Sequence, residues 1–383
     1  MRKVHLCDIT LSITDGKHGD CRDSNGSGYF FISCKDVHDN AIDYSHARQI
    51  TKEDYEDVNR RTNLQPNDIL VTNSGTIGRT AFIKDVPETY KTTFQKSVAI
   101  VKPDTSAVNP KYLFYLLQNC VRLFVNSSNG SAQKNLLLGT MRRFELIIEE
   151  NIEKQKQLAN ILSAYDDLIE NNNRQIKLLE EAAQRLYKEW FVDLHFPGYE
   201  DCKIVDGVPE GWHNGTLGEL AEFKRGKTIT RAEVKEGSVP VVAGGLNPAY
   251  YHNIANTKAP VITVSGSGAN AGFTRLYQED VFASDCSYID KNTTDKLYFV
   301  YCYLKENMYQ LDAMQRGSAQ PHVYAKDINA MRVGIPRYDL IALFCNKVSD
   351  YYDLIGRLQL QSSLASEARD RLLPKLMSGE IEV

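Results

Sequence analysis

Residues 158–190 read LANILSAYDDLIENNNRQIKLLEEAAQRLYKEW, and their apolar side chains recur at alternating steps of four and three residues. This spacing is the heptad pattern of an α-helix that buries one seam against a second helix. Neither Gly nor Pro interrupts residues 150–192, so we expect one continuous helix roughly 60 Å long, which needs a partner to cover its apolar stripe. The seam comprises Leu158, Leu162, Tyr165, Ile169, Asn172, Ile176, Leu179, Ala183, Leu186 and Trp190.

The same pattern returns between Phe344 and Leu376, and this second helix is the candidate partner of the first. A polar seam residue such as Asn172 commonly fixes the register of a helix pair, and we expect Asn172 to face Leu358 or Ser362. Leu168, Leu178, Leu354 and Leu364 lie off the two seams and are candidates for a second apolar face. The second seam comprises Phe344, Val348, Tyr351, Ile355, Leu358, Ser362, Ala365, Arg369, Leu372 and Leu376.

The composition is that of a soluble protein with more than one domain. A chain of 383 residues is long enough for at least two domains. No stretch approaches the roughly 18 consecutive apolar residues of a membrane span, and the first residues do not form an apolar signal segment. The eight cysteines are scattered without a Cys-x-x-Cys pair. We therefore expect reduced thiols, no metal site and a cytoplasmic location.

Charge composition leaves nucleic-acid binding open. The net charge is −4 at pH 7, and segments 1–149, 150–193, 194–336 and 337–383 carry net charges of +2, −3, −2 and −1. Because no segment is strongly basic, a DNA-binding surface would need its cations concentrated locally.

Two globular bodies flank the long helices. Short β-branched or aromatic runs between turn residues predict strands at 28–33, 68–72, 80–83, 97–101 and 144–148, with a helix over 110–125. After Pro197 and Gly198, strands return at 239–242, 261–264 and 331–335, with a helix over 297–311. The predicted class is α+β: two mixed α/β bodies (1–149 and 194–336) joined by two long helices (150–193 and 337–383). The matching seams predict a coiled coil, and the duplication suggests pseudo-two-fold symmetry.

Two polar loops in the first body are candidates for binding chemistry. The loop 73–79, Asn-Ser-Gly-Thr-Ile-Gly-Arg, would bring backbone N–H groups and Arg79 close to a phosphate or a base edge. The loop 130–134, Gly-Ser-Ala-Gln-Lys, offers Gln133 to an adenine edge and Lys134 to a phosphate. Each is also consistent with an ordinary turn, and the polar loop 15–20 is ambiguous in the same way.

Both loops recur in the second body, in the same order. Residues 265–272 follow a predicted strand as residues 73–79 do, and Gly317-Ser318-Ala319-Gln320 repeats the tetrapeptide 130–133 in nearly the register of the two seams. Two loops that recur in register ahead of two matching helices arise by chance much less often than either loop alone. They are therefore predicted to be shared functional features.

Several motifs resemble those of the specificity subunits of type I restriction-modification systems. The run 185–193, RLYKEWFVD, is similar to their central conserved region, together with Phe196-Pro197-Gly198, Pro209-Glu210-Gly211-Trp212 and Leu217-Gly218. The run 372–381, LLPKLMSGEI, is similar to their C-terminal conserved region, and Lys154-Gln155 to Ile161-Leu162 fits the start of their central helix. The helix-opening Pro-x-x-x-Glu-Gln pattern appears only as residues 149–155, EENIEKQ, and the second helix lacks Glu-Gln near Phe344. These departures concern the geometry of the helix starts.

The resemblance implies that each body is a target recognition domain reading one half of a split site in double-stranded DNA. The two long helices would pair antiparallel, set the spacer and bind two modification (methyltransferase) subunits, which hold S-adenosylmethionine. Restriction and translocation would belong to further subunits, so this chain is expected to be non-catalytic, without a cofactor of its own or a membrane partner. Lys17, Lys227 and Arg231 are expected at the DNA backbone. At the groove we expect Asn73, Ser74, Thr76, Arg79, Ser131, Gln133, Lys134, Ser265, Ser267, Asn270, Gln320 and His322.

The main rival is an enzyme, above all a DNA adenine methyltransferase. Asn247-Pro248-Ala249-Tyr250 approaches the Asn-Pro-Pro-aromatic loop of such enzymes but has Ala in place of the second Pro. Gly226-Lys227-Thr228 lacks the earlier glycine of a nucleotide-binding loop, because position 221 is Ala. Residues 266–271 approach a dinucleotide fingerprint, but Phe273-Thr274 predicts a strand where that motif opens a helix.

Two further alternatives remain. A coiled-coil adaptor without DNA reading explains the long helices but not the glycine loops shared by both bodies. A single-polypeptide restriction enzyme needs catalytic domains in the same chain, and two repeats within 383 residues leave no room for them.

Overall fold

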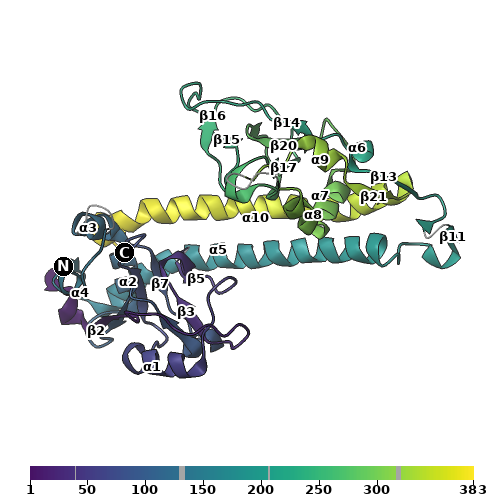
Figure 1. The fold of residues 1–383 in the computed structure, drawn as a ribbon. Coiled ribbons are helices and arrows are strands. Elements are labelled where there is room, and N and C mark those ends of the chain that lie inside the picture. The colour runs from purple at the N-terminus through teal and green to yellow at the C-terminus, as the bar shows by residue number, and fades with distance from the viewer. Residues whose placement is uncertain (39, 129–133, 206–207, 316–320) are drawn as a thin grey trace. The chain divides into compact units, whose positions relative to one another are not determined.

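The computed structural model describes residues 1–38, 40–128, 134–205, 208–315 and 321–383. The chain divides into two compact units (Figure 1): unit 1 comprises Met1–Ile169 and Leu364–Val383, and unit 2 comprises Glu170–Ser363. Each unit therefore contains one globular body and a part of each long helix. The four-part division expected from the sequence, which separates the helices from the bodies, stays a prediction.

Unit 1 is built around an antiparallel sheet of order β2-β9-β6-β7, formed by β2 (Thr10–Asp15), β9 (Val98–Pro103), β6 (Ile69–Thr72) and β7 (Thr80–Phe82). β3 (Phe30–Ile32) runs parallel to β8 (Thr92–Phe94), and β1 (Arg2–His5) runs antiparallel to β10 (Glu145–Ile148). The other elements are β4 (Val37–His38), β5 (Ala41–Ile42), α1 (Lys52–Thr62), α2 (Pro110–Asn119), α3 (Val121–Asn126), α4 (Leu138–Arg142), η1 (Leu6–Ile9), η2 (Cys34–Asp36) and η3 (Pro87–Lys91).

Unit 2 contains a sheet of order β14-β20-β17-β18, formed by β14 (Lys224–Arg225), β20 (Cys286–Asp290), β17 (Val261–Ser265) and β18 (Thr274–Tyr277). β15 (Val239–Val242) runs parallel to β19 (Phe282–Ala283) and antiparallel to β16 (Tyr250–His252), and β13 (His213–Thr216) pairs with β21 (Arg332–Ile335). The other elements are β11 (Ile204–Val205), β12 (Val208–Pro209), α6 (Leu217–Leu220), α7 (Leu297–Glu306), α8 (Met308–Ala313), α9 (Ala325–Asn329), η5 (Tyr199–Asp201) and η6 (Gly268–Asn270).

The two units share one topology, which confirms the predicted duplication. β9 and β20 each lie second in a four-stranded antiparallel sheet, and each unit also has one short parallel pair, β3–β8 or β15–β19. The central strands β6 and β17 are buried along their whole length, as expected for strands covered on both faces. The units differ in their insertions, since unit 1 has α1 between β5 and β6 whereas unit 2 has β16 between β15 and β17.

Two predicted helices are each broken into two. The helix predicted over 110–125 is divided at Cys120 into α2 and α3, and the one predicted over 297–311 is divided at Asn307 into α7 and α8. At both breaks the residue leaves helical geometry, with ψ of 3° at Cys120 and 26° at Asn307. The apolar pattern continues through each break because both short helices pack on the same core, so periodicity alone predicted one helix.

The long helices are α5 (Ile152–Tyr187), which continues as the π-helical turn η4 (Lys188–Val192), and α10 (Tyr338–Ser378). In unit 1 Asp166 contacts Arg369, and Leu158 and Leu376 belong to one core. In unit 2 Tyr187 contacts Phe344. Within each unit the residue numbers thus rise along one helix as they fall along the other, so the helices pair antiparallel.

The predicted seam lies inside this pair. All twenty seam residues are buried or half-buried. The Asn172 amide donates to Gln361 Oε1 at 3.0 Å and to Ser362 Oγ at 3.2 Å. Of the two partners predicted for Asn172, Ser362 is therefore the one observed. Among the four leucines off the seam, Leu178 and Leu364 are exposed and Leu168 and Leu354 are half-buried.

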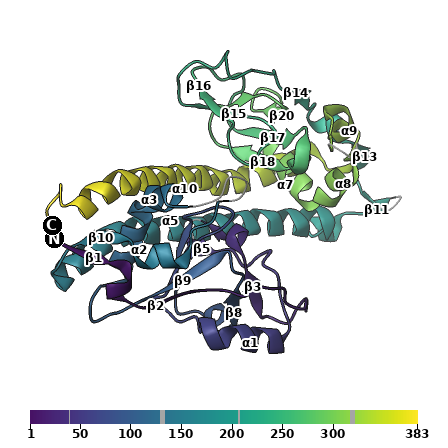
Figure 2. The same ribbon diagram turned by 60° about the vertical axis from the view of Figure 1, so that its left-hand side comes forward.

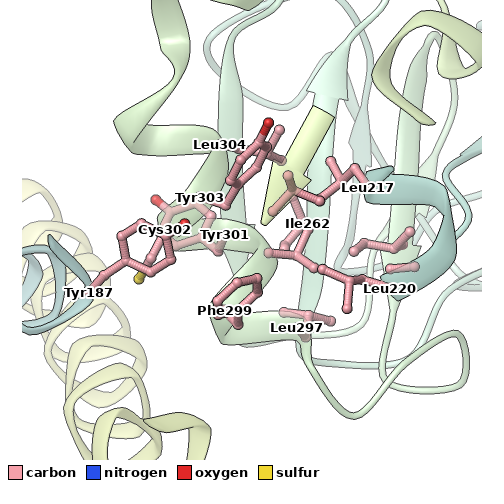
Figure 3. Packing of buried hydrophobic residues seen from close by; sticks show 14 of the residues in the cluster. Tyr187, Leu217, Leu220, Ile262, Leu297, Phe299, Tyr301, Cys302, Tyr303 and Leu304 are labelled. Carbon is pink, nitrogen blue, oxygen red and sulfur yellow. The ribbon is translucent and has the colours of Figure 1, made fainter. Parts of the chain in front are cut away.

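Each body is anchored on the helices by its own core. Figure 3 shows Tyr187 of α5 reaching the body of unit 2 beside Cys302 and Tyr301 of α7, and the Tyr187 and Phe299 ring centroids lie 5.4 Å apart. In unit 1, α2 lies along α5 (Figures 1 and 2), and the Tyr115 hydroxyl donates to Asp166 Oδ2 at 2.5 Å. A search of the described helices found none with the length and apolar character needed to span a membrane.

Candidate nucleic-acid interface

The first predicted loop, residues 73–79, closes the β6–β7 hairpin of unit 1. Its base is held by Thr72, whose backbone N–H donates to Arg79 O at 2.8 Å and whose Oγ1 accepts from Arg79 N at 2.9 Å. Gly78 has a φ of +90°, and a Cβ there would lie 2.7 Å from Val121 Cγ1. Both the backbone angle and the space therefore require glycine at position 78.

This loop pairs with the chain that follows the second predicted loop. Leu136 N donates to Asn73 O at 2.7 Å, and Ser74 and Asn135 form an antiparallel bridge. In unit 2 Val323 N donates to Gly266 O at 3.1 Å, and Ser267 and His322 form the matching bridge. In both units, the structure thus brings the hairpin loop together with the residues that directly follow the second predicted loop.

A Gly-Lys turn joins this surface in each unit. Lys17 N donates to Phe94 O at 2.8 Å, and a Cβ on Gly16 would lie 1.9 Å from that oxygen. Lys227 N donates to Ala283 O at 3.0 Å, and a Cβ on Gly226 would lie 2.3 Å from Ser284 O. The two turns cross equivalent segments, between β8 and β9 in unit 1 and between β19 and β20 in unit 2. Glycine lets the backbones approach this closely.

The segments crossed by the Gly-Lys turns also contact the hairpin loops. Asn73 N donates to Ser97 O at 3.0 Å, and Gly266 N donates to Asp285 O at 3.2 Å. Each unit therefore brings three segments together: a Gly-Lys turn, a hairpin loop and the extended segment that pairs with that loop. We call these the unit 1 surface (16–18, 73–79 and 134–136) and the unit 2 surface (226–231, 265–272 and 321–324).

Cations gather on both surfaces although the chain as a whole is acidic. Arg79 and Lys134 are exposed in unit 1, as are Lys227 and Arg231 in unit 2. Lys17 is half-buried, with Nζ 3.7 Å from an Asp57 carboxylate oxygen. Exposed cations at a loop surface suit phosphate oxygens.

Some predicted side chains support the loops from inside. Asn73 and Ser265 are 4% and 3% exposed. Ser265 Oγ donates to Gly244 O at 3.2 Å, and among the described residues no donor reaches Asn73 Oδ1. Ser74 and Asn270 are half-buried, and Thr76 is exposed. Contact of any of these side chains with DNA stays a prediction.

The predicted His322 and Ser267 of the unit 2 surface contact residues that the sequence did not single out, namely Tyr324 with its neighbour Lys326, and Asp285. The rings of His322 and Tyr324 stack with centroids 5.9 Å apart, and Lys326 Nζ lies 5.8 Å from the Tyr324 ring centroid. Ser267 Oγ donates to the Asp285 carboxylate. When the two repeated tetrapeptides are aligned, His322 corresponds to Asn135. The repeat in the sequence could therefore have indicated Asn135 as a candidate residue.

Three predicted residues, Ser131, Gln133 and Gln320, lie outside the described residues. Next to the repeated tetrapeptides at 130–133 and 317–320, the structure describes the segments that follow them, 134–136 and 321–324.

The rival enzyme motifs lie in other settings. Asn247 to Ala249 form the turn before β16, where Ala249 N donates to Val241 O at 2.9 Å within an antiparallel hairpin. Gly226-Lys227 follows the short strand β14, and no helix opens there. β18 begins at Thr274, as predicted from the strand-like run after Phe273. Among the described residues, no three His, Cys, Asp or Glu side chains gather as metal ligands.

Comparison with protein families accounts for most of the chain. The family model of the type I restriction modification DNA specificity domain matches residues 15–181 and 209–340, one segment for each body. The chain belongs to this family. The two matched segments of this specificity subunit contain its two hairpin loops and the segments that pair with them.

Its relatives match this chain in sequence along most of their length. The type I restriction enzyme MjaIX specificity subunit of Methanocaldococcus jannaschii is 26% identical, over 82% of this chain and 78% of the relative. The HindI specificity subunit of Haemophilus influenzae is 21% identical, over 74% of this chain and 80% of the relative. A type I restriction-modification S subunit from M. genitalium, known from a crystal structure, is 17% identical with a TM-score of 0.61, covering 98% of this chain and 95% of that one. This match supports the fold.

Proposed function

We propose that this specificity subunit reads a split DNA site, with the unit 1 and unit 2 surfaces each contacting one half. The observation that carries the proposal is the equivalent loop pairing of the units, in which Asn73 O and Gly266 O accept from Leu136 N and Val323 N. Two equivalent readers on one chain suit a recognition sequence made of two half-sites. Their insertions and side chains differ, so the half-sites differ in sequence.

The chemistry of the surfaces suits duplex DNA. Arg79 is exposed and can present a bidentate fork to a guanine edge or a phosphate, while Lys134, Lys227 and Arg231 meet phosphates. Loop backbone N–H groups add contacts that position the duplex. Lys17, whose Nζ lies near Asp57, would exchange that ion pair for a phosphate.

The helix pair sets the spacer between the half-sites and binds the partner subunits. Leu178 in unit 2 and Leu364 in unit 1 are exposed and occupy equivalent positions when the two seams are aligned. Equivalent exposed leucines on the two helices suit two copies of one partner, the methyltransferase subunit. That partner holds S-adenosylmethionine and flips the target adenine from the duplex, and cleavage and translocation belong to a further subunit. The chain itself then performs no methyl transfer and works in the cytoplasm.

The decisive experiment is methylome sequencing of DNA from cells that express this chain with its modification subunits. A bipartite methylated motif with a fixed spacer is expected. Methylation at a continuous site would contradict two separate readers. In a second assay, purified chain incubated with DNA and methyl donor should transfer no methyl group, and transfer without partners would instead favour the methyltransferase alternative.

Replacing single arginines separates the two readers. Arg79→Ala should weaken recognition of one half-site by about 1–3 kcal/mol of binding free energy, whereas Arg231→Ala, at a phosphate, should weaken binding to the other half-site whatever its bases. Site-selection profiles measure the first effect, and affinity for duplexes that carry a single half-site measures the second. Lys3→Ala is a matched control, because Lys3 is an exposed cation of unit 1 whose Nζ is occupied by Glu145 at 2.8 Å. Equal loss at both halves would point to folding instead.

A further inference from the structure

A polar cluster lies where the body of unit 1 meets both long helices. Asp166 on α5 accepts a hydrogen bond from the Tyr115 hydroxyl at Oδ2, over 2.5 Å. Its Oδ1 accepts from the Arg369 guanidinium on α10 and from Asn40 Nδ2, the latter at 3.4 Å. The side chains of Asp166 and Arg369 are only 23% and 16% exposed. We call these two residues the cross-helix pair.

Partial burial makes each charge depend on the other. Burial lowers the pKa of Arg369, but hydrogen bonds from its guanidinium to Asp166 and Asp370 outweigh this and raise the pKa above its ordinary value. Arg369 is therefore charged throughout the physiological range. Removing one member of a partly buried ion pair leaves the other without compensation, which destabilises the structure more than the intact pair stabilises it.

The repeat-equivalent positions in unit 2 carry no charge. Aligning the two seams, Leu158 with Phe344, relates Asp166 to Tyr352 and Ala183 to Arg369. Ala183 and Tyr352 are both buried, and the Tyr352 hydroxyl lies 3.3 Å from Cys302 Sγ. Unit 1 therefore holds a charge pair across the helices, whereas unit 2 holds two buried, uncharged side chains at the equivalent positions.

The second polar contact shows this asymmetry in part. Asn172 on α5 donates to Gln361 and Ser362 on α10. The position equivalent to Asn172 on α10 is Leu358, and the position equivalent to Ser362 on α5 is Ile176, whereas Gln361 is matched by Gln175. The charge pair therefore distinguishes the two helices more sharply than the Asn172 contact does.

Pairing of either helix with a second copy of itself would break these matches. Two antiparallel α5 helices in the equivalent register would place Asp166 opposite Ala183, and two α10 helices would place Arg369 opposite Tyr352. Each arrangement loses the opposite charge across the helices: Asp166 keeps hydrogen bonds from the uncharged Tyr115 and Asn40, and Arg369 keeps its contact with Asp370 on its own helix. The apolar seam alone gives no such discrimination, since most of its residues are aliphatic or aromatic in both helices.

We infer that Asp166 and Arg369 select the partner of each long helix, directing α5 onto α10 and rejecting a second copy of the same helix. This selection matters because the N-terminal half of the chain (1–192), which ends with α5 and η4, and the C-terminal half (213–383), which ends with α10, are covalently joined only through residues 193–212. Halves joined by one linker can be exchanged between two copies of a chain. The cross-helix pair ensures that helices of different kinds meet, so that each helix pair carries one reader of each kind.

Charge reversal in the full-length chain tests the selection without DNA. Asp166→Arg places two arginines at the cross-helix position, and Arg369→Asp places two aspartates there. When the two variants are mixed after unfolding, exchange of halves restores an opposite-charge pair in both particles. We expect a 1:1 mixed dimer, measured by light scattering on differently tagged chains, with a thermal midpoint above that of either variant alone. If mixed dimers are no more abundant than in a mixture of tagged wild-type chains, the inference is wrong.

Two further variants separate the cross-helix contact from other effects of the substitutions. The double variant Asp166→Arg/Arg369→Asp should stay monomeric and recover part of the midpoint lost by Asp166→Arg. Both of these chains lose the contacts of Asp166 with Tyr115 and Asn40, so recovery isolates the cross-helix contribution, and no recovery would overturn it. Asp167→Arg makes the same charge change at the neighbouring exposed position, and it should form no mixed dimer. If a single variant does not fold alone, co-expression of the two variants provides the same readout. Absence of mixed dimers would overturn the inference about helix pairing and would leave the proposed DNA reading intact.

Discussion

At the scale of single residues, two glycines of the candidate interface stand where a larger residue would overlap a neighbouring backbone. Gly16 and Gly226 allow the backbone of a Gly-Lys turn to approach a neighbouring carbonyl more closely than any Cβ permits. The sequence marked Gly16 only as part of an ambiguous polar loop and Gly226 only as part of an incomplete nucleotide motif, because glycines that bend a chain and glycines that admit another chain look alike in a sequence.

Gly16→Ala should therefore displace the turn that carries Lys17. Its Cβ would meet Phe94 O at 1.9 Å, and relief of such a contact costs about 1–3 kcal/mol of unfolding free energy. Denaturant unfolding measures the loss. The control is Gly19→Ala in the same loop, where a Cβ meets nothing within 4 Å. Equal effects of the two changes would contradict the steric explanation.

The cysteines provide a test of burial. Burial raises the pKa of Cys286 and Cys302 to about 12 and that of Cys120 and Cys345 to about 11. At pH 8 these thiols are almost entirely protonated and shielded, so a thiol reagent should modify exposed Cys7 first and these four only on unfolding. Mass spectrometry of the labelled chain identifies the order, and early labelling of Cys302 would contradict the packing of α7.

At the scale of elements, the helix α5 contributes directly to the core of unit 2. Tyr187 is 4% exposed and contacts the rings of Phe191, Phe299 and Phe344. The heptad seam led to Ala183, Leu186 and Trp190 but not to Tyr187, because a seam position describes only contact with another helix. A globular body packed beside the helix buries a wider stripe.

Tyr187→Ala should destabilise unit 2 by about 3–5 kcal/mol, the usual cost of removing a large buried aromatic side chain. Leu178→Ala on the same helix removes a side chain that is 59% exposed, and it should change stability by less than about 0.5 kcal/mol. Hydrogen exchange of the unit 2 sheet separates a local effect from global unfolding. A change of similar size in both variants would contradict the anchoring role of Tyr187.

At the scale of the whole molecule, the duplicated architecture makes helix length part of the proposed recognition. Deleting 168–174 from α5 and 360–366 from α10 removes one heptad from each helix and keeps the Asp166–Arg369 contact of unit 1. The pair becomes about 10 Å shorter, which corresponds to roughly three base pairs at about 3.4 Å each. The methylated motif should lose about that much spacer, and an unchanged spacer would contradict the proposed role of the helices.

The sequence by itself determined the helices, the seam that each buries against the other, the duplication and the two recurrent loops. Each is encoded locally, by a heptad period, by turn residues or by a repeat register that persists along the chain. The tertiary structure decided that Ser362 and Gln361 face Asn172, that a Gly-Lys turn joins each hairpin loop, and that Asp166 pairs with Arg369. These features join residues distant in the sequence, and only close packing selects one such contact from the many that composition and periodicity allow.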